Sequence, residues 1–145
     1  MNALAPLTHS TPATMQLLRK AAQSTNANIL PLIYNEDTNI VIWQRSTAEK
    51  LTKAVNALIA TSALKPIELA VSPNDAFDRL ITVLKPEDNN RDEVNTLCED
   101  IALLVEMFCC LFDLKRAGLR LTVLELPMCP RFHVDKIPCR LVTTY

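Results

Sequence analysis

The sequence predicts an α+β fold in which an N-terminal layer of helices packs on an incomplete, mainly antiparallel sheet. In the middle of the chain, apolar residues recur at three- and four-residue steps, the period of helices that pack by one face. After Gly118 the chain instead consists of short segments rich in β-branched residues, which is typical of strands. Helices with two early strands, followed by a run of strands, are characteristic of α+β domains.

The length and the two ends of the chain indicate how the domain is organised. At 145 residues the chain is long enough for one core, and we expect a flexible leader over residues 1–10 and a single domain over residues 11–145. The sequence ends within the strand-like segment Arg140–Tyr145 and contains one glycine, although turns in β-rich domains usually need several. We therefore expect the N-terminal part of a longer domain, truncated on its C-terminal side.

Three elements are expected in the first third of the chain. Thr11-Pro12 supplies an N-cap and a first-turn proline for a helix over about residues 13–23. Residues 26–34 are mostly apolar but contain Pro31, so we expect an extended segment at a sheet edge. Residues 39–43 predict a short strand after a turn-like Asn-Glu-Asp.

Three helices and one strand are expected in the middle of the chain. The capping-box pattern Ser46-Thr47-Ala48-Glu49 begins a helix that runs to about residue 62. A strand over residues 66–72, a helix that starts at 72–75 and ends at Lys85-Pro86, and a long central helix over about 91–114 follow. The expected buried face of the first of these helices consists of Leu51, Val55, Leu58 and Ile59.

The last part of the chain predicts a turn and three strands. Gly118 suits the turn after the central helix, because glycine adopts the left-handed backbone that often ends a helix. Residues 119–126, 129–135 and 139–145 are then expected to be strands.

Composition narrows the classes of function. A formal net charge of −1 gives no overall field that would attract nucleic acid or an acidic membrane. Residues 115–145 carry a local excess of basic side chains, which would suit an anionic small-molecule substrate or simply the solvated side of a sheet. No secretory signal and no membrane-spanning run is visible, so we expect a cytoplasmic protein with reduced thiols.

The five cysteines form an odd set without the spacing of a disulfide framework. Cys98, Cys109 and Cys110 lie within the central helix, where we expect them to be buried like small apolar residues.

His133 and Asp135 are the candidate metal ligands. In a strand, residues two apart point to the same face, so this imidazole and carboxylate would supply two ligands of a 2-His-1-carboxylate site. No histidine follows in the ten residues after Asp135 to serve as the third ligand. Alternatively, His133 is an ordinary half-buried strand residue that pairs with Asp135 or with a neighbouring threonine.

A zinc site is the second possibility. It would use Cys129 with His133 and Asp135, and with Cys139 if the backbone brings that thiol to the same side. Pro130 disturbs the alternation, and both cysteines could equally be ordinary core residues. A Cys-His hydrolase is a weaker alternative, and no catalytic residue is assigned.

Three blocks of sequence carry a resemblance to a known family. They are Ile-Val-Ile-Trp-Gln-Arg over 40–45, the apolar block 101–114, and the segment from Gly118 through Met-Cys-Pro-Arg-Phe-His-Val-Asp to Tyr145. Together they resemble an uncharacterised proteobacterial family, domain of unknown function 1826. The resemblance implies further elements after Tyr145, including a distal histidine and an arginine-rich strand, in a layout similar to that of cupin-like, double-stranded β-helix oxygenases that use Fe(II) and 2-oxoglutarate.

The resemblance assigns roles to few residues of this chain. It implies that His133 and Asp135 are the proximal metal ligands. Apart from the resemblance, we expect Arg131 and Arg140 to contribute positive potential for a cofactor. The leading hypothesis is therefore a metal-binding, cupin-like protein that is inactive in this truncated form. The alternatives are a non-enzymatic zinc-binding or metal-homeostasis module, and a structural remnant that needs a partner, with self-association through the C-terminal strand.

Overall fold

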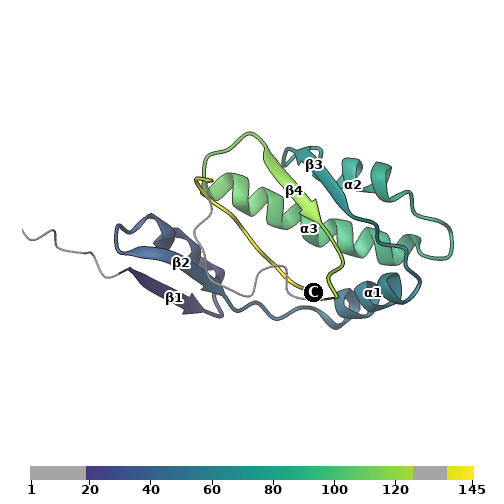
Figure 1. The fold of residues 1–145 in the computed structure, drawn as a ribbon, viewed down its shortest axis with the longest axis horizontal. Coiled ribbons are helices and arrows are strands. Elements are labelled where there is room, and N and C mark those ends of the chain that lie inside the picture. The colour runs from purple at the N-terminus through teal and green to yellow at the C-terminus, as the bar shows by residue number, and fades with distance from the viewer. Residues whose placement is uncertain (1–18, 126–136) are drawn as a thin grey trace, which may run out of the picture. The chain divides into compact units, whose positions relative to one another are not determined.

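The structure is a computed structural model that describes residues 19–125 and 137–145, and it mixes helices with short strands (Figure 1). The chain divides into two compact units, which we call the N-terminal unit (Met1–Arg45) and the C-terminal unit (Ser46–Tyr145). The α+β class is confirmed at this level. A leader over 1–10 and a single domain over 11–145 stay predictions.

The N-terminal unit is built on two parallel strands. Strand β1 (Lys20–Ser24) pairs in parallel with β2 (Thr38–Trp43), and the 3₁₀ helix η1 (Ala27–Tyr34) connects them. The predicted strand over 39–43 is confirmed. The predicted helix over 13–23 is wrong for its described part, because residues 20–23 pair with β2 and this ladder overrides the helix-forming Lys-Ala-Ala-Gln composition.

The predicted extended segment over 26–34 is wrong, because these residues form η1. The side chain of Asn26 caps this helix by accepting a 2.9 Å hydrogen bond from the amide of Asn28. Pro31 lies inside the helix, where its fixed φ is compatible with helical backbone. A proline is therefore a weaker argument against a short helical turn than against a long helix.

The described part of the N-terminal unit, residues 19–45, contains no buried residue. Its main ordered contacts surround Trp43, whose indole Nε1 donates to the carbonyl of Thr25 over 3.1 Å, while the guanidinium of Arg45 lies 6.0 Å from the ring centre. An ion pair of 3.0 Å joins Lys20 to Asp37, and its hydrogen bond and charge lower the pKa of the Asp37 carboxyl. Polar and aromatic contacts thus hold this small unit together.

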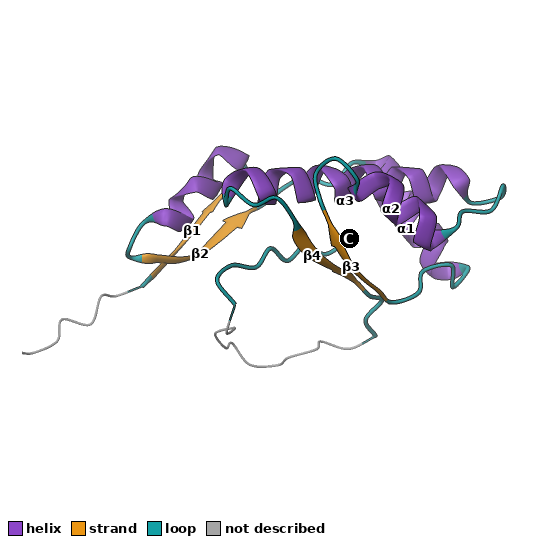
Figure 2. Cartoon of the chain, turned by 90° about the horizontal axis from the view of Figure 1, so that it is seen from above, coloured by secondary structure: helices purple, strands orange, loops and turns teal. Residues whose placement is uncertain are grey.

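The C-terminal unit has a layer of helices and a two-stranded antiparallel sheet (Figure 2). Helix α3 (Arg91–Leu111) packs against both α1 (Glu49–Ala60) and α2 (Ala76–Leu84). Strand β3 (Ile67–Val71) pairs with β4 (Ala117–Leu121) in the other layer. The predicted mainly antiparallel sheet is not confirmed, since the two described sheets are one parallel pair and one antiparallel pair.

The core of this unit lies between the helices and the inner face of β3–β4. Leu58 and Leu97 are 1% exposed and Val71 and Leu80 are 0% exposed, so each contributes nearly its full apolar surface, about 1.5–3 kcal/mol for a large side chain. The predicted face of α1 is confirmed except for Ile59, which is 44% exposed. The core cluster comprises Leu51, Val55, Leu58, Val71, Ala76, Leu80, Val94, Leu97, Cys98, Ile101, Val105 and Cys109.

The helix boundaries agree with the predicted ones to within a few residues, but the caps differ. Ala48 is the N-cap of α1 and no side chain caps it, so the predicted capping box at 46–49 is not formed. Helix α3 ends at Leu111 because Asp113 adopts a left-handed backbone with φ of 50°. The amide of Leu114 then donates to the carbonyl of Cys109 over 2.8 Å, which closes the helix end.

Gly118 is not the turn residue that the sequence predicts. It lies within β4, directly opposite Ala70 of β3, and its φ is not positive. Part of the predicted strand 119–126 is confirmed by β4. The predicted strand over 139–145 is wrong, because these residues form no ladder, and the predicted strand over 129–135 lies outside the described residues.

Candidate functional site

The predicted site residues divide between the described and the undescribed parts of the chain. Cys129, Arg131, His133 and Asp135 lie outside the described residues. Arg140 is described and is exposed on the segment 137–145. The structure therefore gives geometry for the sequence on both sides of the His-x-Asp pair.

Both sides belong to the C-terminal unit. Before the pair, β4 is fixed by its ladder with β3 and by an ion pair of 3.5 Å between Arg120 and Glu68 on the outer face. After the pair, the hydroxyl of Tyr145 donates a 2.7 Å hydrogen bond to Oδ2 of Asp100 on α3. The described residues before and after the His-x-Asp pair are thus both attached to this unit.

The Tyr145–Asp100 contact is the feature that sequence reasoning missed. Asp100 lies in α3 with Thr96 and Leu104 one turn before and after it, so the three residues share one face of the helix. Thr96 and Leu104 are 8% and 7% exposed. Leu104 lies seven residues after the buried Leu97, close to the core side of α3, and no local pattern in the sequence indicates the contact with Tyr145.

The described residues form no alternative metal site. Within residues 19–125 and 137–145, no group of three or more His, Cys, Asp or Glu side chains could hold a metal ion. Both histidines of the chain, His9 and His133, lie outside that part, so this finding concerns other places in the molecule. The imidazole of His133 and the carboxylate of Asp135 are ligand types that suit Fe(II) or Zn²⁺.

Of the three cysteines of α3, the buried Cys98 and Cys109 are not candidate ligands or nucleophiles, whereas Cys110 is exposed. Burial raises the pKa of the Cys98 thiol to about 12, with a smaller effect of the neighbouring Glu99 charge. Burial also raises the pKa of Cys109, so both remain protonated thiols. The prediction of a buried Cys110 is wrong, since it points out of α3 and is exposed, whereas Cys139 is half-buried.

The basic residues of β4 and its approach have structural partners. Arg116 donates to the carbonyl of Ala70 over 3.1 Å, and Arg120 pairs with Glu68. Part of the local positive charge is therefore used to hold β3 and β4 together. Arg116 and Arg120 are therefore less suited to bind an anionic substrate.

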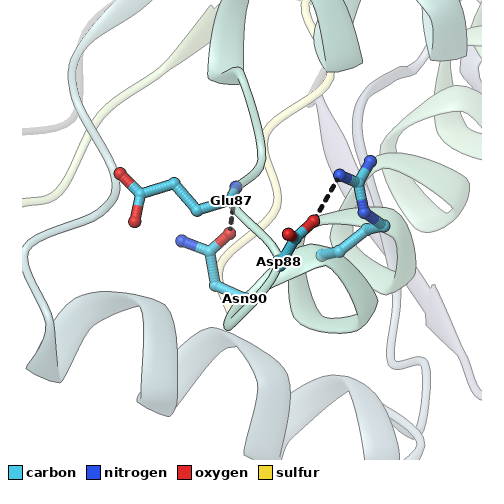
Figure 3. A network of polar contacts seen from close by, with 4 residues as sticks. Glu87, Asp88 and Asn90 are labelled. Atoms are coloured by element: carbon cyan, nitrogen blue, oxygen red, sulfur yellow. Dashed lines mark hydrogen bonds and ion pairs between the residues drawn. The ribbon is translucent and has the colours of Figure 1, made fainter.

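The polar side chains just before α3 and α2 form hydrogen bonds that shape the turns leading into these helices. In the loop before α3, the side chain of Asn90 accepts a 2.9 Å hydrogen bond from the amide of Glu87, and Asp88 pairs with Arg91 at 3.0 Å (Figure 3). These contacts shape the turn that precedes the helix.

At the start of α2, Oδ1 of Asp75 accepts from the amide of Ser72 over 2.6 Å. The hydrogen bonds from Ser72 lower the pKa of the Asp75 carboxyl, and the charges of Arg79 and Arg116 lower it further. This carboxylate is engaged in the turn at the start of α2.

No helix in the described ranges is long and apolar enough to cross a membrane.

Comparison with known proteins gives one match. Neither the curated proteins nor the solved structures contain a significant match to the chain. Residues 24–145, which include every predicted ligand, match the model of a family described as "Protein of unknown function (DUF1826)", and the chain belongs to that family.

Proposed function

We propose that this protein is a cupin-like metal-binding protein of the Fe(II)/2-oxoglutarate oxygenase type, with His133 and Asp135 as the ligand pair. The observation that carries the proposal is the His-x-Asp spacing inside the matched family region, residues 24–145. A neutral imidazole and an ionised carboxylate on one face are two of the three ligands in the facial site of non-haem iron oxygenases.

The roles of the residues follow from their chemistry. His133 and Asp135 would hold the metal, and Fe(II) bound there would supply open coordination positions for oxygen and a cosubstrate. Arg131 and Arg140 would bind the carboxylate of 2-oxoglutarate, because a guanidinium pairs with a carboxylate through two parallel hydrogen bonds. The substrate is a small molecule.

Metal binding is tested by equilibrium loading with Fe(II) under anaerobic conditions, followed by gel filtration and elemental analysis. His133→Ala and Asp135→Ala should each lower the metal affinity by at least tenfold, because each removes one ligand from the set. His9→Ala is the matched control, since it removes the only other histidine and should leave the affinity unchanged. Equal iron content in the wild type and in His133→Ala would contradict the proposal.

Cosubstrate binding is a separate test of the same proposal. Titration calorimetry of the Fe(II)-loaded protein with 2-oxoglutarate should give binding that Arg140→Gln weakens and Arg79→Gln, an exposed arginine of α2, does not. If iron binds through His133 but 2-oxoglutarate does not bind, the metal site stands and the oxygenase class is wrong.

A zinc-binding module is the second candidate, and the placement of Cys139 favours it. This thiol is half-buried rather than enclosed in the core, so it remains accessible for coordination together with Cys129. Zinc that is retained by the wild type and lost in Cys129→Ser would support this candidate over the oxygenase. Cys110→Ser, which removes an exposed thiol of α3, is the control.

A further inference from the structure

We infer that Tyr145 and Asp100 are positioning residues, whose hydrogen bond sets the register of residues 139–145 and thereby keeps Arg140 on the outer face of that stretch. We call residues 139–145 the C-terminal segment. What Arg140 binds rests on the proposed function, in which it pairs with the carboxylate of 2-oxoglutarate. The register itself depends only on described residues.

The C-terminal segment has one face toward the protein and one face toward solvent. Figure 1 shows it, in yellow, as an extended stretch. Exposure alternates along it, since Cys139 is half-buried and Leu141 and Tyr145 are 40% and 37% exposed, whereas Val142 is 76% exposed. Side chains of extended backbone alternate between two sides, so the odd-numbered residues form the inner face and Arg140 lies on the outer face.

Strand pairing does not fix this alternation. The C-terminal segment forms no ladder with the described strands, so backbone hydrogen bonds to such a neighbour do not determine which of its residues face inward. A shift by one residue would exchange the two faces and turn the side chain of Arg140 toward the protein. The register must therefore come from side-chain contacts.

The contact between Tyr145 and Asp100 supplies a fixed point for the register. The tyrosine hydroxyl donates to Oδ2 of Asp100 over 2.7 Å, and Asp100 lies on α3 three residues after Leu97, which is 1% exposed in the core. A short hydrogen bond to a carboxylate is directional, so it ties the inner face to one position along the helix. Arg140 and Thr143 also have interaction partners, so losing this bond loosens the register rather than releasing the segment.

The thiol of Cys139 reports the register without any ligand. In Tyr145→Phe this inner-face thiol should be exposed more often, and its alkylation by iodoacetamide in the native protein should become about fivefold faster, the effect of losing part of one hydrogen bond to a charged group. The exposed Cys110 is the internal standard and should react at an unchanged rate. Tyr34→Phe changes the only other tyrosine and should alter neither rate. Equal Cys139 rates in Tyr145→Phe and the wild type overturn the inference.

Variants of Asp100 test the same contact from the side of the helix. Asp100→Ala removes the acceptor and should speed the alkylation of Cys139 as much as Tyr145→Phe does. Asp100→Asn keeps an acceptor oxygen and should restore most of the protection. Circular dichroism verifies that the variants are folded, and a folded Asp100→Ala with the wild-type alkylation rate overturns the assigned contact.

Titration of the Fe(II)-loaded protein with 2-oxoglutarate, at equal iron content, tests the effect on Arg140. Tyr145→Phe should weaken binding about fivefold. It should weaken binding no further in a protein that already carries Arg140→Gln, because it acts through that arginine. Unchanged binding in Tyr145→Phe, or an equal loss in both backgrounds, overturns the positioning role. A wild type that does not bind 2-oxoglutarate, although Tyr145→Phe speeds the alkylation of Cys139, overturns the proposed function and leaves the register role intact.

Discussion

The left-handed backbone position after α3 is occupied by Asp113, and Gly118, five residues later, lies in a regular strand. Asp113 has φ of 50°, whereas the φ of Gly118 is not positive. Ser62 and Lys85 have φ of 54° and 49° where α1 and α2 end. In the described part of the chain, the helix ends are therefore closed by residues that have a Cβ, which explains how a chain with one glycine forms three turns that usually need it.

Replacing Lys85 or Ser62 by glycine should stabilise the protein. A left-handed backbone costs an L-residue roughly 1–2 kcal/mol, and glycine avoids that cost while losing part of the gain to its greater freedom in the unfolded chain. We expect Lys85→Gly and Ser62→Gly each to raise the free energy of unfolding by about 0.5–1 kcal/mol in urea titrations. Asp113→Gly should gain less, since aspartate tolerates this conformation better. A loss of stability in all three variants would show that these side chains have roles beyond the turn.

Gly118→Ala should also stabilise the protein, for the opposite reason. Its backbone suits any residue, and a Cβ at this position would have no atom within 4 Å. Glycine within a strand costs roughly 0.5–1 kcal/mol relative to alanine, so the substitution should raise the urea midpoint without changing the slope. A decrease would mean that another part of the chain lies close to this position in solution.

Leu97→Ala should be among the most destabilising single changes in the described core. Leu97 is 1% exposed on the buried face of α3, and truncating such a leucine costs roughly 2–5 kcal/mol through lost burial and the cavity that remains. Leu103→Ala is the matched control on the same helix, because Leu103 is 50% exposed and should change the stability by about 0.5 kcal/mol or less. Similar losses for both leucines would contradict the packing of α3 described above.

The helices of the C-terminal unit could be predicted from the sequence because their signals are local. The three- and four-residue spacing of Val94, Leu97 and Ile101 places the buried face of α3 without knowledge of its neighbours. Pro86 likewise marks the end of α2, since the residue before a proline disfavours the helical region.

The other parts of the fold could not be predicted, because they depend on contacts between residues that are far apart in the sequence. Strand β1 exists because residues 20–24 pair with residues 38–43, and nothing in Lys-Ala-Ala-Gln-Ser alone indicates this. Residues 139–145 show the converse, since a strand-like sequence without a hydrogen-bonded neighbour forms no ladder. The proposed site at His133 and Asp135 rests only on residue type and spacing, which suggest a ligand pair but neither its partners nor the metal.

The cysteines should react with thiol reagents in a defined order. Cys110 is exposed and should be alkylated first in the native protein, followed by the half-buried Cys139. Cys98 and Cys109 should react only on unfolding, because burial both shields them and raises the pKa of each thiol, that of Cys98 to about 12. Mass spectrometry after iodoacetamide treatment with and without urea checks this order, and native labelling of Cys98 ahead of Cys110 would contradict it.

Asp75 should make the protein more stable at neutral pH than in acid. Its carboxylate accepts the amide of Ser72 at the start of α2, and this bond, with the nearby arginines, lowers the pKa of Asp75 below its usual value of 3.8. A group whose pKa is lower in the folded state stabilises that state above the unfolded pKa, and the contribution disappears as the pH falls through the folded pKa. Asp75→Asn should therefore be less stable than the wild type at pH 7, and the difference should shrink as the pH falls below 3.8. Asp75→Ala, which also removes the hydrogen-bond acceptor, should remain less stable than the wild type even in acid. Urea titrations of the three proteins between pH 7 and pH 2 separate the charge from the hydrogen bond, and a difference between wild type and Asp75→Asn that does not depend on pH would refute the assigned role of the carboxylate.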